Sequence, residues 1–297
     1  MNESTVISHL RILDIDPKKV RRIELIHREH GNRLYRVHWN AKSSILKLFK
    51  GATEATEIQN YELLQRLKVR TLGVHGWTQK ALLLEDLATS PCWRLAKEDD
   101  LADSETGVAI AKWYRRLHSA GRKLLGSKDG TPSFLGREVD ELNPYTIKEI
   151  GKKLGLAHDS VWKLAAENIE KIKKAMRSLT ETLNYNDFYW TNLALSRSEG
   201  GNLQAIVFDY HLLGIGLTYS DCRNVTGSLK DKARSSFWET YGPIDEREKL
   251  LDDPTAVLYA LFAALRLPTF PHWGQGCLDK VENGELEKSL RRALEIV

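Results

Sequence analysis

Two neighbouring segments in the second half of the chain carry the residues best suited to chemistry. LNYNDFYWTNLAL, at residues 183–195, holds Asp187 and Asn192 five positions apart, and in AIVFDYHLLGIG, at residues 205–216, Asp209 follows an apolar run. A hairpin that brings these oxygen ligands together would suit Mg²⁺, which prefers carboxylates and phosphate oxygens. A carboxylate on the same loop can orient or deprotonate a hydroxyl, as phosphoryl transfer from a nucleotide requires. The alternative is that these side chains only close turns or cap helices.

A lysine in an apolar strand is the second candidate. Lys47 lies in the run Ile45–Phe49, where a lysine is poorly placed unless it has an anionic partner. The expected partner is Glu57 on the following helix, because its i+4 and i+7 neighbours are apolar and put it on the inward face. Glu54, one turn earlier, is an alternative. A further alternative is that Lys47 belongs to an edge strand and extends its ammonium group to solvent.

A small-residue turn, His30-Gly31-Asn32, precedes the lysine strand. Such a turn can bring backbone N–H groups over phosphates, so Gly31 and Asn32 are candidates for nucleotide binding. The alternative is that the turn merely connects two strands.

The pattern of apolar residues predicts the elements that must position these side chains. The first part of the chain is expected to hold a short helix, a three-stranded antiparallel meander, a helix and two further strands. Their expected ranges are 1–16, then 20–27, 34–39 and 43–49, then 53–67, then 74–77 and 81–84. The apolar run that ends at Glu85 and Asp86 leads into a segment, 86–95, that we interpret as the link between two lobes.

After that link the pattern becomes helical. Helices are expected over 106–120 and 161–179, with an irregular segment over 121–147 between them. Two short strands at 193–195 and 205–208 should form a hairpin around the turn Ser-Glu-Gly-Gly-Asn. The remainder is expected to form three helices, near 229–241, 254–266 and 279–296.

Composition confines the possibilities to a globular protein. The 297 residues are 42% hydrophobic and 28% charged, proportions that exclude a disordered or fibrous chain. The 44 basic residues nearly cancel the 40 acidic ones, and a net charge of +4 predicts no nucleic-acid partner. The longest apolar runs, such as 260–265, are far too short to span a bilayer, so no membrane association is expected.

The cysteines and the N-terminus indicate a compartment. Cys92, Cys222 and Cys277 are odd in number and far apart, so they predict neither a disulfide framework nor a zinc site and favour a reducing environment. The N-terminal segment carries acidic residues and lacks an apolar run after a basic start, unlike a signal peptide. We therefore expect a cytoplasmic protein.

The order of these parts resembles a protein-kinase-like fold, and the motifs resemble the aminoglycoside phosphotransferase family, whose relatives include the choline and ethanolamine kinases. The resemblance covers about residues 20–225, and the catalytic loop with the following Asp is its most specific part. The motifs are GNRLYRV at 31–37 for the nucleotide loop, LKLF at 46–49 for the lysine strand, LLLEDL at 82–87 for the hinge, WYRRLHS at 113–119 for a helix, NDFYWTNL at 186–193 for the catalytic loop, FDY at 208–210 for the second metal motif, then Gly214, Gly216 and YSD at 219–221.

The resemblance implies how this chain would hold a nucleotide. Lys47 would contact the α- and β-phosphates, and Glu57 would hold Lys47. Backbone groups near Glu85 and Leu87 would receive the adenine or guanine base. The implied co-substrate is ATP or GTP with Mg²⁺.

The resemblance also implies roles around the catalytic loop. Asp187 would be the catalytic base or the group that orients the acceptor hydroxyl. Asn192 and Asp209 would bind Mg²⁺. Asp221 would be structural and would hydrogen-bond the catalytic loop from below.

Two positions depart from the family pattern. The family usually has His two residues before the catalytic Asp, where this chain has Tyr185; that His mainly braces the loop, and a tyrosine with a polar tip can replace it. Aminoglycoside enzymes usually have Gly at the position of Asn186, where choline and ethanolamine kinases often have Asn.

Three aromatic residues adjoin the proposed catalytic residues and form a candidate acceptor pocket. Tyr189, Trp190 and Tyr210 would hold a cationic or ring-shaped acceptor by cation–π contact or stacking. The acidic run at 245–253 would add attraction if it folds toward the cleft. The alternative is that the aromatic residues are core and the acidic residues begin an exposed helix.

The sequence therefore predicts an α+β, two-lobed protein-kinase-like fold. A small antiparallel-sheet N-lobe for nucleotide binding is expected over residues 1–88, and a larger, mostly helical lobe for catalysis and substrate binding over 89–297. The predicted function is that of an aminoglycoside-phosphotransferase-like small-molecule kinase, which transfers the γ-phosphate of ATP or GTP to a hydroxyl. The alternatives are a choline, ethanolamine or other metabolite kinase, and, from another class, a catalytically silent nucleotide-binding scaffold.

Overall fold

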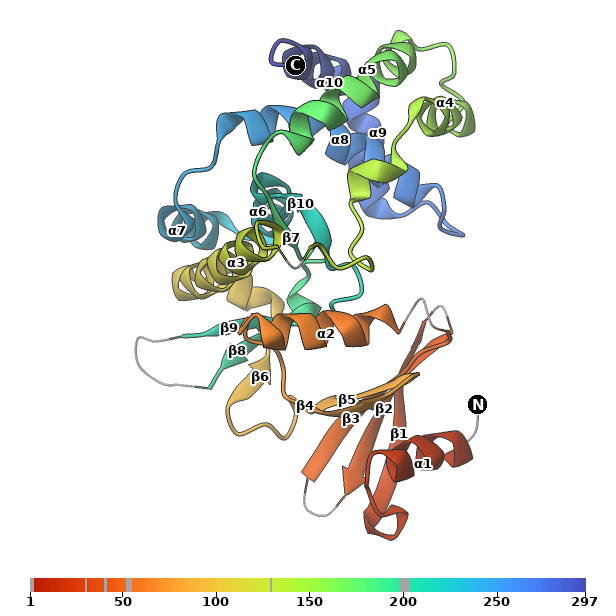
Figure 1. Ribbon diagram of the computed structural model, residues 1–297, viewed down its shortest axis with the longest axis vertical. Coiled ribbons are helices and arrows are strands. Elements are labelled where there is room, and N and C mark those ends of the chain that lie inside the picture. The colour runs from red at the N-terminus through yellow and green to blue at the C-terminus, as the bar shows by residue number, and fades with distance from the viewer. Residues whose placement is uncertain (1–2, 30, 40–41, 52–54, 129, 198–202) are drawn as a thin grey trace. The chain divides into compact units, whose positions relative to one another are not determined.

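Alternating apolar residues near the N-terminus build a five-stranded antiparallel sheet. Its strand order is β1-β2-β3-β5-β4, and the first three strands form the predicted meander. Its strands are β1 (Val20–Glu29), β2 (Asn32–Trp39), β3 (Lys42–Leu48), β4 (Val74–Thr78) and β5 (Ala81–Glu85). The computed structural model describes residues 3–29, 31–39, 42–51, 55–128, 130–197 and 203–297 (Figure 1).

The two faces of this sheet pack against different helices. One face presents Tyr35, Val37, Leu46 and Leu83 to helix α1 (Glu3–Ile12). The other face carries the residues that alternate with these along the strands. They are Leu34, Arg36, Ile45, Lys47 and Leu84. Helix α2 (Thr56–Arg66) turns Glu57 toward Lys47 on this second face. The period-2 pattern thus separates an apolar core from the face that carries the candidate site.

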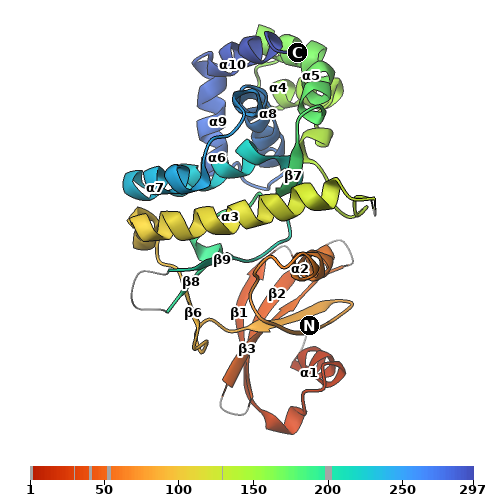
Figure 2. The ribbon, with the colours of Figure 1, turned by 60° about the vertical axis from the view of Figure 1, so that its left-hand side comes forward.

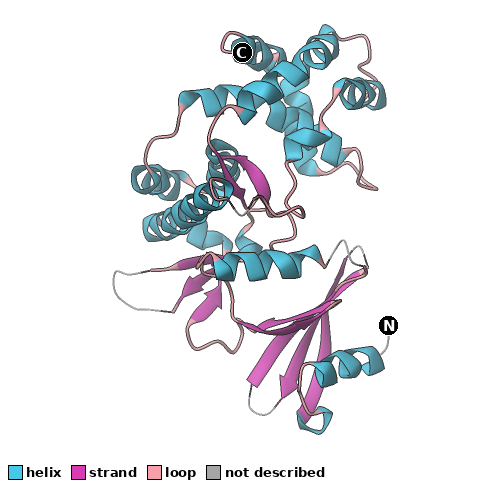
Figure 3. Cartoon of the chain, in the orientation of Figure 1, coloured by secondary structure: helices cyan, strands magenta, loops and turns pink. Residues whose placement is uncertain are grey.

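A second small sheet completes the surroundings of the candidate site. Its order is β6-β8-β9, all antiparallel, and the β8–β9 pair is the predicted hairpin (Figure 3). The turn predicted at 198–202 lies outside the described residues. The strands are β6 (Trp93–Leu95), β8 (Leu193–Ser196) and β9 (Ala205–Val207), and the short 3₁₀ helices of the chain are Pro17–Lys19, Glu98–Ala102, Glu138–Glu141 and Trp190–Asn192.

The C-terminal part is mostly helical, as predicted. Five of its helices, α4, α5, α8, α9 and α10, bury one continuous apolar core, and β7 pairs with β10, whose Leu217 joins that core. The elements are α3 (Ser104–Leu125), α4 (Pro144–Lys153), α5 (Ser160–Arg177), β7 (Glu181–Asn184), β10 (Gly214–Leu217), α6 (Thr218–Ser228), α7 (Asp231–Tyr241), α8 (Glu246–Ala264), α9 (His272–Glu282) and α10 (Glu285–Leu294) (Figure 2). None of the helices in the described ranges has the length and apolar character that a membrane span needs.

Three predictions in the helical part were wrong or incomplete, and one further helix was not predicted. The segment predicted to be irregular contains the start of α4, where Asn143 accepts hydrogen bonds from the first backbone N–H groups. Helix α8 begins at Glu246, after its N-cap Asp245, and continues through Pro254, where the sequence had predicted a start. The helix predicted over 279–296 is two helices, broken at Gly284, whose φ is +79°. Helix α6 was not predicted.

The chain divides into two compact units. The first contains residues 1–116, 187–213 and 225–241, and the second contains 117–186, 214–224 and 242–297. The lobe boundary at residues 88 and 89 stays a prediction.

A close approach between α3 and α7 in the first unit gives a test of the packing. A Cβ atom at Gly107 would lie 2.1 Å from the carbonyl oxygen of Ala233, whereas one at Gly227 would meet no atom within 4 Å. Gly107→Ala should therefore lower the free energy of unfolding by about 1–3 kcal/mol through overpacking. Gly227→Ala should be neutral or stabilising, because alanine favours a helix. Urea unfolding measures both, and equal effects would show that the two helices do not pack this closely.

Candidate active site

A cavity of about 460 Å³ opens beside the second face of the large sheet, within the first unit. Apolar side chains from the strands and from the segments at Leu72 and Phe208 line part of it. Charged groups line the rest. The lining includes Leu34, Arg36, Ile45, Lys47, Glu57, Leu84, Glu85, Asp86, Leu87, Arg197 and Asp209.

Lys47, in the lining of this cavity, lies between two carboxylates. Its Nζ is 2.6 Å from Oε2 of Glu57 and 2.7 Å from Oδ1 of Asp209. The predicted ion pair with Glu57 is confirmed. The alternative of an edge strand is excluded, because β3 lies between β2 and β5. The alternative partner, Glu54, lies outside the described residues.

Burial gives this trio its electrostatic character. The Lys47 side chain is 14% exposed and that of Glu57 is 1% exposed. Burial alone would lower the pKa of Lys47, but the charges of Glu57 and Asp209 outweigh it and hold that pKa well above its ordinary value. Burial opposes the charge on Asp209 too, yet the hydrogen bond with His211 and the charge of Lys47 hold the pKa of Asp209 far below its ordinary value. Lys47 is therefore a cation and Asp209 an anion at neutral pH.

His211 is a residue of this site that the sequence analysis did not single out. Its Nδ1 is 3.0 Å from Oδ1 of Asp209 and 3.9 Å from Oδ2 of Asp187. The imidazole thus lies close to both carboxylates. Its place two residues after Asp209 was the one available signal in the sequence.

Asp187 and Asn192 form a second polar pair in the same unit. The Asn192 Nδ2 group donates to Oδ2 of Asp187 at 3.0 Å, which leaves the amide oxygen of Asn192 as an acceptor. The Asp187 side chain is 18% exposed, and burial raises its pKa to about 6. The spacing of five residues therefore does bring the two side chains together.

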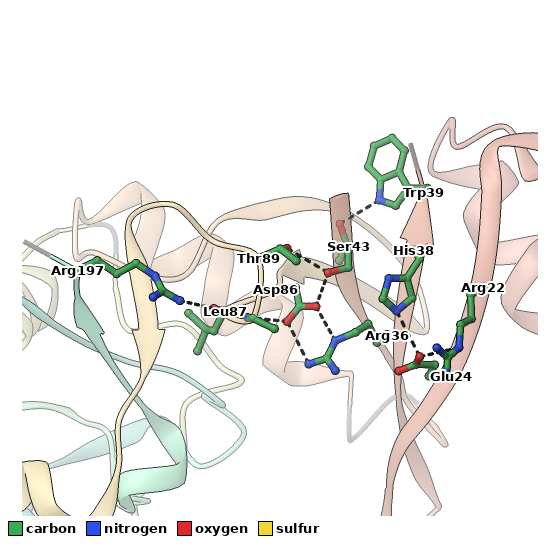
Figure 4. A network of polar contacts seen from close by, with 12 residues as sticks. Arg22, Glu24, Arg36, His38, Trp39, Ser43, Asp86, Leu87, Thr89 and Arg197 are labelled. Carbon is green, nitrogen blue, oxygen red and sulfur yellow. Dashed lines mark hydrogen bonds and ion pairs between the residues drawn. The ribbon is translucent and has the colours of Figure 1, made fainter. Parts of the chain in front are cut away.

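The hinge after β5 is fixed by a network around Asp86 (Figure 4). Arg36 donates to both oxygens of this carboxylate, from Nε at 2.6 Å and from Nη2 at 3.3 Å. Ser43 Oγ and the Ala88 N–H also donate to it, at 2.6 and 3.0 Å. Four donors thus satisfy one buried carboxylate, and they fix the turn beside the candidate base-binding residues.

A second arginine holds the other side of the hinge. Arg197 Nη2 donates to the carbonyl of Leu87 at 3.5 Å, and its Nε donates to the carbonyls of Ser90 and Trp93. The Glu85 carboxylate accepts from Ser90 Oγ at 2.5 Å, so its side chain is committed to the hinge itself. The sequence analysis singled out neither Arg36 nor Arg197, because their partners lie far away along the chain.

The candidate nucleotide loop is described in part. His30 lies outside the described residues. Gly31 has a φ of +91°, a conformation that glycine adopts without strain. The Asn32 side chain accepts from the backbone N–H of Lys50 at 3.0 Å, which fixes the loop to the end of β3.

The backbone before Asp187 is held by a buried carboxylate of the second unit. Asp221 accepts from the N–H groups of Tyr185 and Asn186, at 2.8 and 3.1 Å. Nε2 of His118, on α3, lies 3.1 Å from the same carboxylate. Asn186 has a φ of +66°, so this left-handed turn is fixed from one side by Asp221. Tyr185 is fully buried at the same turn.

The three predicted acceptor-pocket aromatics do not share one environment. Tyr189 is 51% exposed and Trp190 is half-buried. Tyr210 is fully buried, and its ring packs edge-on against Tyr61 at 4.7 Å and parallel to Trp113 at 6.5 Å. The Tyr210 ring thus belongs to the core, as the alternative interpretation had it.

Part of the acidic run is also committed to structure. Asp252 is buried and contacts Nε of Arg223 at 2.6 Å, and Glu248 accepts from the N–H of Tyr219 at the start of α6. These bonds hold α8 against α6 within the second unit.

Solved structures of other proteins share the fold of this chain. No family model matches the chain, and no curated protein matches it. The choline kinase LicA of Streptococcus pneumoniae has a TM-score of 0.63 at 13% identity over 99% of this chain and 100% of its own. An ethanolamine kinase of Plasmodium vivax has a TM-score of 0.64 at 13% identity, over 97% and 92%. A GDP complex of an aminoglycoside 2′-phosphotransferase-IIIa mutant has a TM-score of 0.64 at 12% identity, over 96% and 98%.

These matches define the class of structure. The chain has the protein-kinase-like, α+β fold of the choline and ethanolamine kinases and the aminoglycoside phosphotransferases. The predicted resemblance and fold class are confirmed at this level. The solved neighbours are small-molecule kinases, and some of them are in complex with ADP or GDP.

The Asp86 network predicts a defined pH dependence of stability. Asp86→Asn should lower the free energy of unfolding by about 1–3 kcal/mol at neutral pH, because the amide leaves a buried donor without its acceptor. Burial raises the pKa of Asp86, but the hydrogen bonds from Arg36 and Ser43 outweigh it and lower that pKa below its ordinary value. The stabilisation is therefore present above the unfolded-state pKa and is lost as the pH falls through the folded-state pKa.

Urea unfolding of the wild type and the variant, at neutral and at acidic pH, measures this difference. The matched control is Asp231→Asn, because the Asp231 side chain is fully exposed. A difference between wild type and Asp86→Asn that stays constant as the pH falls would contradict the assignment.

Proposed function

We propose that this protein is a Mg²⁺-dependent small-molecule kinase that transfers the γ-phosphate of ATP or GTP to a hydroxyl group. The observation that carries the proposal is the set of groups gathered in the first unit. Lys47 is held by Glu57 and Asp209, and Asp187 lies near both Asn192 and His211. The solved structures with this fold support it, because they include enzymes in complex with ADP or GDP.

The cavity supports nucleotide binding at its two ends. In the proposed complex the purine contacts the apolar side chains Leu34, Ile45 and Leu84 and the backbone near Glu85 and Leu87. Lys47 holds the α- and β-phosphates by its charge. The second face of the sheet thus provides both an apolar wall and a cation.

The donor chemistry at Asp209 and Asn192 fits Mg²⁺. Among the residues that the structure describes, no three His, Cys, Asp or Glu side chains form a metal-ligating set. A cation here would be held by the Asp209 carboxylate, the Asn192 amide oxygen and phosphate oxygens, which are hard ligands of the kind that Mg²⁺ binds. When bound, the metal would neutralise charge on the phosphates during transfer.

Asp187 takes the role of base or orienting group in this proposal. It accepts the proton of the acceptor hydroxyl while the acceptor oxygen forms a bond to the γ-phosphorus. The bond from that phosphorus to the bridging oxygen breaks, and the nucleoside diphosphate leaves with the electron pair. Asn192 holds the Asp187 carboxylate in place through its 3.0 Å hydrogen bond.

The acceptor is proposed to be a small hydroxylated molecule, with an aminoglycoside-like cation as the leading class. Choline, ethanolamine or another metabolite is the alternative, and Asn186 favours it. Both classes occur among the solved neighbours, which include choline and ethanolamine kinases and a spectinomycin phosphotransferase in complex with ADP and spectinomycin. Tyr189 and Trp190, beside Asp187 in sequence, are the aromatic residues that remain candidates for contact with this acceptor.

A screen of nucleotide consumption tests the function. Purified protein is incubated with ATP or GTP and Mg²⁺, together with aminoglycosides, other hydroxylated antibiotics, amino alcohols or sugars. We expect acceptor-dependent formation of nucleoside diphosphate with at least one class. Binding of nucleotide without turnover on any acceptor would favour the scaffold alternative.

The role of Asp187 can be tested with the acceptor that this screen identifies. Asp187→Asn should lower kcat by about 10²-fold or more, because the amide cannot accept the proton. Nucleotide affinity and the melting temperature should barely change. A folded Asp187→Asn variant with near-normal kcat would remove Asp187 from the reaction.

Nucleotide binding by this protein is expected to depend on a divalent metal ion. Calorimetric titration should show that nucleotide binding needs Mg²⁺ or Mn²⁺ and that EDTA weakens it. Asp209→Ala should abolish this dependence together with activity, because the candidate carboxylate ligand is lost. Equal nucleotide affinity with and without EDTA in the wild type would refute the proposed metal site.

A further inference from the structure

The backbone conformation of Asp209 calls for support from its surroundings. Asp209 has a φ of +68°, in the left-handed region that non-glycine residues rarely adopt. Such a residue persists only where the surrounding structure holds it. The turn that runs from Asp209 to Leu213 therefore needs side chains that hold it in place.

One face of helix α2 contacts this turn at the residue after Asp209. Nδ2 of Asn60 donates to the backbone carbonyl of Tyr210 at 2.7 Å, and the ring of Tyr61 packs edge-on against the ring of Tyr210. Glu57 lies one helical turn before Asn60, on the same face, and contacts Lys47. Since Lys47 contacts Oδ1 of Asp209, α2 fixes Asp209 through its side chain and through the backbone carbonyl of the next residue, Tyr210.

The Tyr210 carbonyl would still have a hydrogen-bond donor without Asn60. The Tyr210 carbonyl also accepts from the N–H of Leu213 at 3.1 Å. Asn60 itself is 1% exposed, and among the described residues its buried Oδ1 has no hydrogen-bond partner. Burying half of an amide without a partner is unfavourable, so this side chain contributes little to the stability of the fold.

We infer that Asn60 is a positioning residue, which holds Asp209 in the orientation that binds the metal–nucleotide complex. The inference rests on the proposed function and adds to it a residue that touches neither nucleotide nor metal. Helix α2 then sets both the lysine, through Glu57, and the aspartate, through Asn60. Displacement of α2 would move both groups away from the phosphates together.

Asn60→Leu is the sharpest variant, because leucine is similar in size and cannot donate. It removes the hydrogen bond to Tyr210 and the buried amide oxygen at once. A purely structural role predicts a lower melting temperature, whereas a positioning role predicts an unchanged or higher one. If Asn60→Leu does not fold, Asn60→Ala removes the same hydrogen bond without adding bulk.

The expected result is a loss of metal coupling in a stable protein. The Mg²⁺ concentration that gives half-maximal binding of the nucleotide, measured by calorimetry, should rise about 3- to 30-fold, the range for residues that modulate coupling without touching a ligand. The kcat should fall about 10-fold or more, because small displacements of reacting groups are costly. The KM for the acceptor should change little.

The matched control is Asn168→Leu. Asn168 lies on α5 in the second unit, and its Nδ2 also donates to a backbone carbonyl, that of Leu164, at 2.9 Å. The same chemical change there should leave both the Mg²⁺ dependence and kcat as in the wild type.

Several outcomes would overturn the inference. An Asn60→Leu variant with wild-type Mg²⁺ dependence and kcat would show that Asn60 positions nothing. A lower melting temperature with a wild-type Mg²⁺ dependence would show a structural role. If the wild type phosphorylates no acceptor but binds Mg²⁺ and nucleotide, the proposed function fails and calorimetry still decides the inference. If the wild type binds neither, both fail.

Discussion

The buried ammonium group of Lys47 is the constraint on which the rest of the candidate site depends. A lysine that is 14% exposed, on a central strand, must have counter-charges, and Glu57 and Asp209 supply them. Glu57 comes from the helix that follows the lysine strand. Asp209 comes from a turn that lies more than 150 positions after Lys47 in the chain. One electrostatic requirement therefore fixes the strand, helix α2 and the Asp209 turn relative to one another.

The polypeptide backbone meets a similar constraint at two places. Asp209 and Asn186 both have positive φ values, and each turn has its own support. Asp221 accepts from the backbone N–H group of Asn186, and Asn60 donates to the carbonyl of Tyr210, the residue after Asp209. Both supports are buried side chains that bond to the main chain, so they fix the direction of the neighbouring carboxylates.

The fold and the chemistry are specified by different features. A TM-score above 0.6 at 13% identity shows how few residues the architecture needs in common with its neighbours. Within that architecture the segment after β5 is fixed by Arg36, which binds a carboxylate, and by Arg197, which binds several carbonyls. It also has Tyr185 buried two residues before Asp187, and His211 close to the carboxylates of Asp187 and Asp209. A fold of this kind serves several acceptors, so acceptor choice depends on such local features.

The sequence by itself determined the elements and the pairings that follow from local patterns. Alternation predicted the meander, and two short apolar runs around a turn predicted the hairpin. Helical periodicity put Glu57 on the inward face, and the apolar neighbours of Lys47 demanded a carboxylate partner. Periodicity carried no signal for the helix caps at Asn143 and Asp245, which depend on hydrogen bonds from one side chain to the first backbone N–H groups. It also carried none for the contacts of Arg36, Asn60 and His118, because their partners are 50, 150 and 103 positions away. Only tertiary folding brings such groups together, since the free energy of a buried polar contact depends on both partners and on the loss of water around them.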